Sequence, residues 1–462
     1  MGISTVLAVI GGGSAGCAAA LAAARLGVDT VLIERETLLG GTSTNAGVNC
    51  WEPVAGATGI PRELYGELAR IPGAAAIYRC NRHFLLPEWN EPPFPGAEQT
   101  IDPAACYEDT LCSGSTLADY AGQLKIRRGI VFEPEAWHSC MSQLLRKAGC
   151  RVICGSPAVA VDCDSSRVRA VELRNAERIE ARMWIDCSGE IARQAGCPVL
   201  VGREARTAWN EPDAPDEPTP QMNAMSWIFR VTPAAEEAVE PLPPEIPENC
   251  WWQSGFPVMV ATRYPNGDLN CNMLPTMDGL EFSRMNPAEA ATECARRVRS
   301  YWHYLQLAYP EFRRFRFLRL FPRPGIRESF RIGCRYMLNE NDMLRGVAAA
   351  EHPDIVAWSD HPMDLHGGER VVRLTGVYGI PYRSLLPLGP ENLLVAGRIA
   401  GFSSLAASGC RLSRTMMQLG QAAGCAAALA HRSGKSFPDL KPVELIALLE
   451  AGGVRLTSLP GR

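Results

Sequence analysis

The start of the chain has the hydrophobic pattern of a buried strand, a helix and a second buried strand. Ile3 to Ile10 is an apolar run rich in β-branched residues, and three glycines follow it directly. Ala15 to Leu26 is almost entirely alanine and leucine, which favour a helix, and Gly27 ends that run before the strand-like DTVLIER. The pattern predicts a βαβ unit with parallel strands and a right-handed crossover.

Later segments are predicted to return to the same sheet. Glu133 to Ala148 has the pattern of an amphipathic helix, and four strand-like runs follow it: RVICG, AVAVDC, RVRAVEL and ERIEARMWIDCSG. Near the C-terminus, NLLVAGR predicts a buried strand and SRTMMQLGQAAGCAAALAHRSG predicts a long helix. We therefore expect a nucleotide-binding domain that is discontinuous in sequence.

The intervening segments predict a second domain. Leu85 to Ala104 is dense in proline, glycine and acidic residues and is expected to be a long loop. RYPNGDLNCNML carries a hairpin signature at Asn266-Gly267, and Pro287 to Leu307 predicts a helix that begins at its proline. The expected α/β fold has a discontinuous first domain (1–85, 133–205 and 375–435), an interleaved α+β substrate domain (86–132 and 206–374) and a peripheral tail (436–462).

Composition places the chain among ordinary soluble globular proteins. Of 462 residues, 47% are hydrophobic and 21% charged, and the formal net charge of −4 attracts neither nucleic acid nor an anionic membrane. No apolar run reaches the roughly 18 residues of a membrane span, and the uncharged stretch up to Ala24 lacks the basic segment of a signal peptide. The 17 cysteines include no Cys-x-x-Cys pair. This pattern indicates a reducing cytoplasm and no metal site, while a homo-oligomer stays open.

The glycines after the first strand have the spacing of a dinucleotide-binding loop. In Gly11-x-Gly13-x-x-Gly16, the first glycine permits the tight turn, the second lets the backbone approach a pyrophosphate, and the third lets helix and strand pack closely. Glu34, at the end of the second strand, is expected to accept hydrogen bonds from the adenosine ribose hydroxyls. An acid there disfavours NADP, which leaves FAD and NAD; the alternative without a ligand is a structural turn with a surface glutamate.

A second glycine loop favours FAD over NAD as the cofactor. LLGGTSTNAG, Leu38 to Gly47, follows the second strand directly, whereas NAD dehydrogenases need no glycine loop there. Together with MWIDCSGE, NLLVAGR and LGQAAGCAAALA, this loop resembles the glutathione-reductase-like FAD superfamily. Within it, GIRESFRIGCRYML, DLHGG, GIPYRSLLP and RLSRTMMQLGQAAG are similar to blocks of bacterial FAD-dependent oxidoreductases. The resemblance implies a Rossmann-like FAD-binding domain holding FAD tightly and non-covalently.

The resemblance also implies which residues contact the cofactor. These are Gly11, Gly13, Ser14, Ala15, Gly16, Glu34, Arg35, Gly40, Gly41, Thr42, Ser43, Val159, Ser188, Gly189, Gly397, Arg398, Arg411 and Leu412. Ser43 and Val48 stand where disulfide reductases carry a redox cysteine pair, which disfavours thiol–disulfide chemistry. Arg398 replaces an acid that many relatives carry, and it is expected to contact phosphate or to close a structural ion pair. The helix that begins near Arg411 would aim its positive end at the flavin pyrimidine ring.

Three residues are candidates for substrate chemistry. His366, in DLHGG, is the preferred proton donor or acceptor, and His361 is either a second one or a loop residue. Arg327 is expected to pair with Glu328 or with a substrate carboxylate, and Arg411 is a second candidate clamp. We expect an oxidoreductase that transfers hydride between flavin N5 and a small polar substrate, such as a hydroxy acid or a sugar-derived alcohol, with an unknown electron acceptor. The alternatives are a partner subunit whose FAD is structural or relays electrons, and a protein that binds NAD alone.

Overall fold

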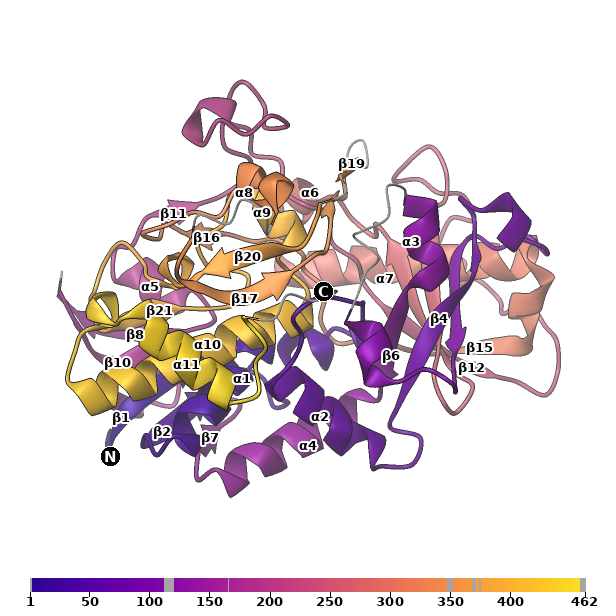
Figure 1. The fold of residues 1–462 in the computed structure, drawn as a ribbon. Coiled ribbons are helices and arrows are strands. Elements are labelled where there is room, and N and C mark those ends of the chain that lie inside the picture. The colour runs from indigo at the N-terminus through magenta and orange to yellow at the C-terminus, as the bar shows by residue number, and fades with distance from the viewer. Residues whose placement is uncertain are drawn as a thin grey trace.

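The computed structural model describes residues 2–111, 120–164, 166–346, 352–367, 371–373 and 375–457. Its two large sheets lie side by side (Figure 1), one with the N-terminal strands and one with β4, β6, β12 and β15. Helices pack on both sheets, so the fold is the predicted α/β class. The glycine-rich turns of the first sheet and one face of the second sheet meet around the site described below.

The first sheet is built as the sequence predicts. Its strands run in the order β7-β2-β1-β10-β9-β8, and β21 adds to β10. Parallel pairs join β7, β2, β1, β10 and β21, whereas β8, β9 and β10 form an antiparallel meander. The bounds are β1 Gly2–Ile10, β2 Thr30–Ile33, β7 Arg151–Ile153, β8 Ala158–Cys163, β9 Val168–Leu173, β10 Arg178–Asp186 and β21 Leu393–Val395.

Two helices from opposite ends of the chain pack together beside this sheet. They are α1 (Ser14–Arg25) and α10 (Ser413–Ser433), and both are almost entirely buried. An added Cβ at Gly420 would lie 2.0 Å from the carbonyl oxygen of Ala15, and one at Gly424 would lie 2.2 Å from that of Ala19. The two backbones are therefore in direct contact, which only glycine allows at these positions.

The second sheet is mixed, with the strand order β15-β12-β14-β13-β5-β4-β6-β3. β5 and β13 pair in parallel, and the other neighbours pair antiparallel. One face packs on α7 through a core that includes Phe229, Met273 and Trp302. The bounds are β3 Cys50–Trp51, β4 Ala75–His83, β5 Gly96–Ile101, β6 Arg128–Phe132, β12 Phe229–Pro233, β13 Val258–Arg263, β14 Leu269–Leu274 and β15 Phe315–Leu320.

The remaining elements are short ladders and helices. The ladders pair β11 (Val199–Leu200) with β16 (Arg331–Ile332), β17 (Ile355–Ser359) with β20 (Tyr378–Pro381), and β18 (Met363–Leu365) with β19 (Val371–Arg373). The other helices are α2 Ile60–Ala69, α3 Tyr120–Ile126, α4 Pro134–Lys147, α5 Glu190–Gln194, α6 Gly279–Arg284, α7 Pro287–Ala308, α8 Glu340–Arg345, α9 Ser404–Gly409 and α11 Pro442–Ala451.

Three local predictions differ from the structure. The expected loop Leu85 to Ala104 contains β5, which is held by its long-range pairing with β13. β4, expected in the first domain, pairs with β5 and β6 and so belongs to the second sheet. The tail after residue 435 is not merely peripheral, because Leu445 and Leu449 of α11 are fully buried in the core with α10. The division into two domains otherwise stays a prediction.

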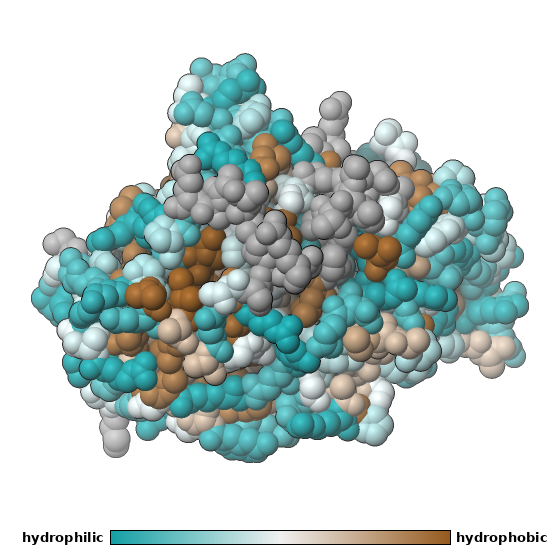
Figure 2. Space-filling model, viewed as in Figure 1, coloured by the Kyte–Doolittle hydropathy of each residue, from teal (hydrophilic) through white to brown (hydrophobic). Residues whose placement is uncertain are grey.

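The surface in the view of Figure 2 is mostly hydrophilic. Apolar residues come to this surface on the side of β20 and α10, between hydrophilic neighbours. Among the described residues, no helix combines the length and the apolar character needed to cross a bilayer.

Candidate functional site

The first glycine loop has the close packing that its motif predicts. An added Cβ at Gly16 would lie 1.8 Å from the carbonyl oxygen of Gly11, so α1 can sit against the turn only with glycine there. At Gly13, in contrast, an added Cβ would meet only Gly41, at 3.9 Å. The two glycine loops touch here, because the Gly40 amide donates to the carbonyl of Gly12 at 2.8 Å. No side chain shields the backbone of Gly13, so a pyrophosphate can reach the amides at the start of α1.

Glu34 follows β2 and is bound to the same loop. Its Oε2 accepts a hydrogen bond from the Gly12 amide at 2.5 Å, and its Oε1 accepts one from the Glu36 amide at 2.8 Å. Burial raises the pKa of Glu34, while these two amides oppose the rise. The side chain is 5% exposed rather than a surface glutamate. Its position at the end of β2 agrees with the role expected toward a ribose.

Serine hydroxyls join the second glycine loop to both long helices. Ser43, fully buried after Gly40 and Gly41, donates to the Oγ of Ser413 at 3.1 Å and lies 3.3 Å from the Oγ of Ser14. Ser14 and Ser413 are the first residues of α1 and α10. The second glycine loop is therefore fixed where two helix N-termini, each with a partial positive charge, come together.

Other predicted cofactor residues lie around these loops. An added Cβ at Gly397 would be 3.3 Å from the Cβ of Ala15. Ser188 and Gly189 are held by the buried carboxylate of Asp186, which accepts hydrogen bonds from both amides and from the Ser188 hydroxyl. Burial raises the pKa of Asp186. The sequence analysis did not single out Asp186, although it ends β10 in the quoted MWIDCSGE.

Two of the predicted cofactor residues are open to solvent. The side chain of Arg35 is 71% exposed and lies 3.5 Å from the carboxylate of Glu36. Val159 lies in β8 and is nearly half exposed. β8 begins two residues after Ser156, whose amide donates to the carbonyl of Glu34. The contact of Val159 with the cofactor stays a prediction.

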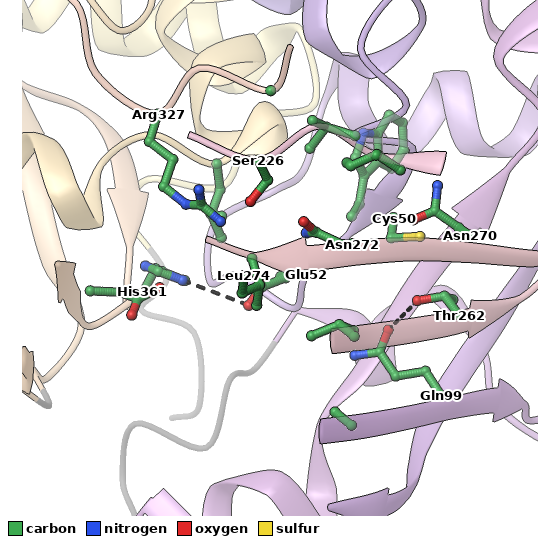
Figure 3. A pocket seen from close by; sticks show the side chains of 18 of the residues that line it. Cys50, Glu52, Gln99, Ser226, Thr262, Asn270, Asn272, Leu274, Arg327 and His361 are labelled. Carbon is green, nitrogen blue, oxygen red and sulfur yellow. Dashed lines mark hydrogen bonds and ion pairs between the residues drawn. The ribbon is translucent and has the colours of Figure 1, made fainter. Parts of the chain in front are cut away.

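A cavity of about 190 Å³ lies between the glycine loops and the second sheet. Thr42, Arg398 and Leu412 line it from the cofactor side, and β5, β13 and β14 line it from the other. Figure 3 shows several of these side chains pointing into a common space. All three predicted catalytic residues, His366, His361 and Arg327, also line this cavity.

His366 is held against the cavity by Asp364. Its Nε2 lies 2.7 Å from Oδ2 of Asp364, and its amide donates to Oδ1 of Asn223 at 2.9 Å. Arg411 donates to the same Asp364 oxygen at 3.0 Å. Burial and the charge of Arg327 lower the pKa of His366 to about 4, although Asp364 opposes this. Burial would raise the pKa of Asp364, but His366 and Arg411 hold it well below its ordinary value. Gly367 follows His366, and the second glycine, Gly368, lies outside the described residues.

His361 faces a second carboxylate. Its Nε2 lies 3.7 Å from Oε2 of Glu52, and its buried Nδ1 has no hydrogen-bond partner among the described residues. Glu52 also forms an ion pair with Arg127. Burial would raise the pKa of Glu52, but Arg127 and His361 lower it. His361 is thus buried in the site rather than free in a surface loop (Figure 3).

Within the described residues, Arg327 and Arg398 do not form the ion pairs that were considered for them from sequence. Glu328 forms an ion pair with Arg331 rather than the expected one with Arg327, whose Nη1 donates to the carbonyl of Ala224 at 2.8 Å. Arg398 donates to the carbonyl of Ile326, and burial lowers its pKa to about 10. In the part of the chain that is described, Arg398 has no carboxylate within ion-pair distance, so the alternative of a structural ion pair is not observed there.

Several site residues escaped the sequence analysis. Glu52, Arg127, Asp364, Ser226 and Asn272 all line the cavity or pair with residues that do. A signal existed for Asp364, because it lies two positions before His366 and alternate residues of a strand share a face. Glu52 and Arg127 come from segments far apart in sequence, with no motif to connect them.

Comparison with known proteins gives a family and distant structural likenesses. A model of the family described as FAD dependent oxidoreductase matches residues 7–449. A search of curated proteins gave no match. Among solved structures, the chain is similar to a geranylgeranyl bacteriochlorophyll reductase-like protein from Thermoplasma acidophilum (14% identity, TM-score 0.49, 98% of this chain and 85% of that one). It is also similar to a flavoprotein/dehydrogenase from Cytophaga hutchinsonii (11%, 0.47, 97% and 82%) and to L-proline dehydrogenase from P. horikoshii (11%, 0.40, 98% and 100%).

Proposed function

The chain belongs to the FAD dependent oxidoreductase family, and from this premise we propose that it oxidises or reduces a small polar substrate, a hydroxy acid or a sugar-derived alcohol, in the cavity lined by His366. The protein is an enzyme and its cofactor is FAD, so the alternative of a protein that binds NAD alone is wrong. The finer placement in the glutathione-reductase-like superfamily is part of the proposal, and the two glycine loops support it.

The residues present fit FAD. No side chain keeps a pyrophosphate from the backbone of Gly13, and Glu34 follows β2 where a ribose is expected. Ser43 and Ser413 bring the second glycine loop to the N-terminus of α10, whose partial positive charge favours an anionic ring. The chemistry that bound FAD supplies is two-electron transfer at N5: oxidation of a C–OH to a C=O passes a hydride there and leaves the hydroxyl proton for a base of the protein.

His366 is the residue that we assign to the proton. With a pKa of about 4 its ring is neutral at pH 7, which is the form that can accept a proton. Asp364 contacts Nε2 and so fixes the ring, and its carboxylate would stabilise the imidazolium that forms. This contact, at a cavity between the glycine loops and the second sheet, is the observation that carries the proposal.

Arg327 and Arg411 are placed to act on the substrate oxygen. Both line the cavity, and the charge of each one reaches His366, because each lowers its pKa. A guanidinium near the reacting C–OH would stabilise the oxygen as it loses its proton. The two guanidinium groups also hold the ring of His366 in its neutral form, since a third positive charge beside two arginines is unfavourable.

Anaerobic titration of the purified holoenzyme tests the proposal. Alcohols and hydroxy acids are added one at a time while the absorbance of oxidised flavin is followed. We expect at least one of them to bleach the flavin stoichiometrically, and its oxidised product to appear in equal amount. A protein that carries FAD but is bleached by none of these compounds would instead support a structural or electron-relay flavin.

A further inference from the structure

The wall of the cavity opposite the glycine loops is built from three strands that present no charged side chain to the cavity. β5, β13 and β14 contribute ten lining residues, none of them Asp, Glu, Lys or Arg: Gly96, Ala97, Gln99, Val258, Met259, Val260, Thr262, Asn270, Asn272 and Leu274. Alternate residues of β14 face the cavity, while Cys271 and Met273 between them are buried in the core under α7. All residues of these three strands are described, so the surface that they present to the cavity is uncharged along its whole length.

Most of the charged side chains that line the cavity lie on its other side, whereas Glu52, which follows β3, and Arg127, which precedes β6, line it from the edge of the second sheet. Arg327, Asp364, His366, Arg398 and Arg411 come from the loops near the glycine motifs and the start of α10. We have assigned these groups to the cofactor and to the reacting C–OH. The part of a substrate that lies against β5, β13 and β14 therefore meets amide, hydroxyl and apolar groups.

Two polar atoms at this wall are buried without a partner. The hydroxyl of Ser226, which is 2% exposed, and Oδ1 of Asn272 make no hydrogen bond within the described part of the chain. Both side chains point into the space in front of Leu274 and Arg327 (Figure 3). A buried polar atom without a partner costs about 1–3 kcal/mol, so such atoms in a cavity indicate a ligand that completes them.

The chemistry of Asn272 restricts that ligand. An amide oxygen accepts hydrogen bonds and cannot donate them, so it calls for an O–H or N–H group and repels a carboxylate. The hydroxyl of Ser226 can donate to the same ligand or accept from it. Nearby, Thr262 donates to Oε1 of Gln99 at 2.6 Å, which extends the row of neutral polar groups along the wall (Figure 3).

From this arrangement we propose that the substrate is an uncharged polyol, with one hydroxyl that reacts near His366 and at least one other that Asn272 and Ser226 bind. The inference rests on the proposed function, and it selects the sugar-derived alcohol over the hydroxy acid. A monohydroxy acid such as lactate has its single hydroxyl on the reacting carbon. It therefore has none left for Asn272, and a carboxylate placed there would face the unpartnered amide oxygen without a hydrogen to donate.

Binding and reduction are measured separately. Xylitol, sorbitol and myo-inositol are titrated into the oxidised holoenzyme, with lactate, malate and glycolate as the comparison set, and binding is followed by calorimetry. Bleaching of the flavin under anaerobic conditions is followed in parallel. We expect a polyol to bind and to bleach the flavin, and the acids to do so at least tenfold more weakly. Binding of a polyol without bleaching would overturn the proposed oxidation and leave only the part of this inference that assigns polyol binding to Asn272 and Ser226. Absence of polyol binding, or preference for the acids, would overturn the inference.

Two variants test the residues. Asn272→Leu and Ser226→Ala should each weaken polyol binding about tenfold, the loss expected for one hydrogen bond, while the FAD content stays unchanged. Ser226→Ala also separates binding from folding, because removal of an unpartnered buried hydroxyl should leave the melting temperature equal or higher. Ser433→Ala, at the exposed C-terminal end of α10, is the matched control and should change neither polyol binding nor FAD content. Unchanged polyol binding in both site variants would contradict the inference.

Discussion

His366 and Arg411 share a single oxygen atom, Oδ2 of Asp364, at 2.7 Å and 3.0 Å respectively. One carboxylate thus orients the histidine at the cavity and fixes a cation beside it. Because the same charge serves both neighbours, the loss of Asp364 would leave a buried arginine without its counter-charge and a histidine free to turn.

Replacement of His366 by alanine should slow substrate-driven flavin reduction by about 10²–10⁴-fold, the usual contribution of a positioned acid or base. The FAD content should stay as in the wild type, because His366 contacts none of the glycine loops in the hydrogen bonds described. Asp364→Asn should also slow flavin reduction, since the neutral amide no longer stabilises an imidazolium. Stopped-flow absorbance measures both rates. His303→Ala on α7, outside the cavity, is the control, and a His366→Ala enzyme as fast as the control would remove His366 from the reaction.

The low pKa of His366 predicts a loss of stability in acid. In the folded protein the pKa is about 4, whereas an unfolded histidine has its ordinary value of about 6.5. Between these values the unfolded chain binds a proton that the folded chain does not, so the free energy of unfolding decreases as pH falls from 6.5 to 4, by about 3 kcal/mol in total. Above pH 6.5 both states are neutral at this residue and it contributes no pH dependence. The melting temperature should therefore decrease more between pH 7 and pH 4.5 in the wild type than in His366→Gln. Equal differences in the two proteins would show that His366 is not buried in its neutral form.

Gly16→Ala should abolish FAD retention. The new methyl group would lie 1.8 Å from the carbonyl oxygen of Gly11, so α1 must move away from the turn that forms the pyrophosphate site. The matched control is Gly66→Ala in α2, where an added Cβ meets no atom within 4 Å and the helix should gain up to about 1 kcal/mol. The flavin-to-protein ratio after gel filtration and the melting temperature report the two effects. Retention of a full equivalent of FAD by Gly16→Ala would contradict the proposed cradle.

Glu34→Gln should weaken FAD binding by about 10- to 100-fold. Each carboxylate oxygen now accepts one backbone amide, and the glutamine side chain can satisfy only one of them while its NH2 group faces the other. A hydrogen bond to a charged group contributes about 1.5–3 kcal/mol, which sets this range. The dissociation constant can be measured from FAD fluorescence with the apoprotein. Glu63→Gln, which changes only an exposed ion pair with Arg25, should bind FAD like the wild type.

The elements that sequence predicted well are those whose signal is local. The first βαβ unit, the meander of β8 to β10, the turn at Asn266-Gly267 and α7 each show a complete hydrophobic period or a turn with a restricted backbone. The glycine spacing was equally informative, because Gly16 is required by a contact with Gly11 only five positions away.

The features that sequence did not predict depend on partners far along the chain. β5 lies in a stretch rich in proline and glycine and becomes a strand by pairing with β4 on one side and with β13 on the other. The neutral wall of β5, β13 and β14 joins segments whose individual patterns gave no indication of a shared cavity. The partner of Glu328 is Arg331, only three positions away, but this choice also depends on a distant residue, because Glu204 is buried with the pair and binds the same guanidinium.

The contact between α1 and α10 has a consequence for the order in which the protein can be made. Ser43 and Ser413 are 370 positions apart, and the backbones of α1 and α10 touch at Gly420 and Gly424. A ribosome delivers α1 and both glycine loops several hundred residues before α10. The growing chain therefore exposes an unfinished cofactor site until α10 has emerged. Chains released before that point are expected to be colourless and open to proteolysis, so bound FAD reports that α10 has been made and has packed on α1.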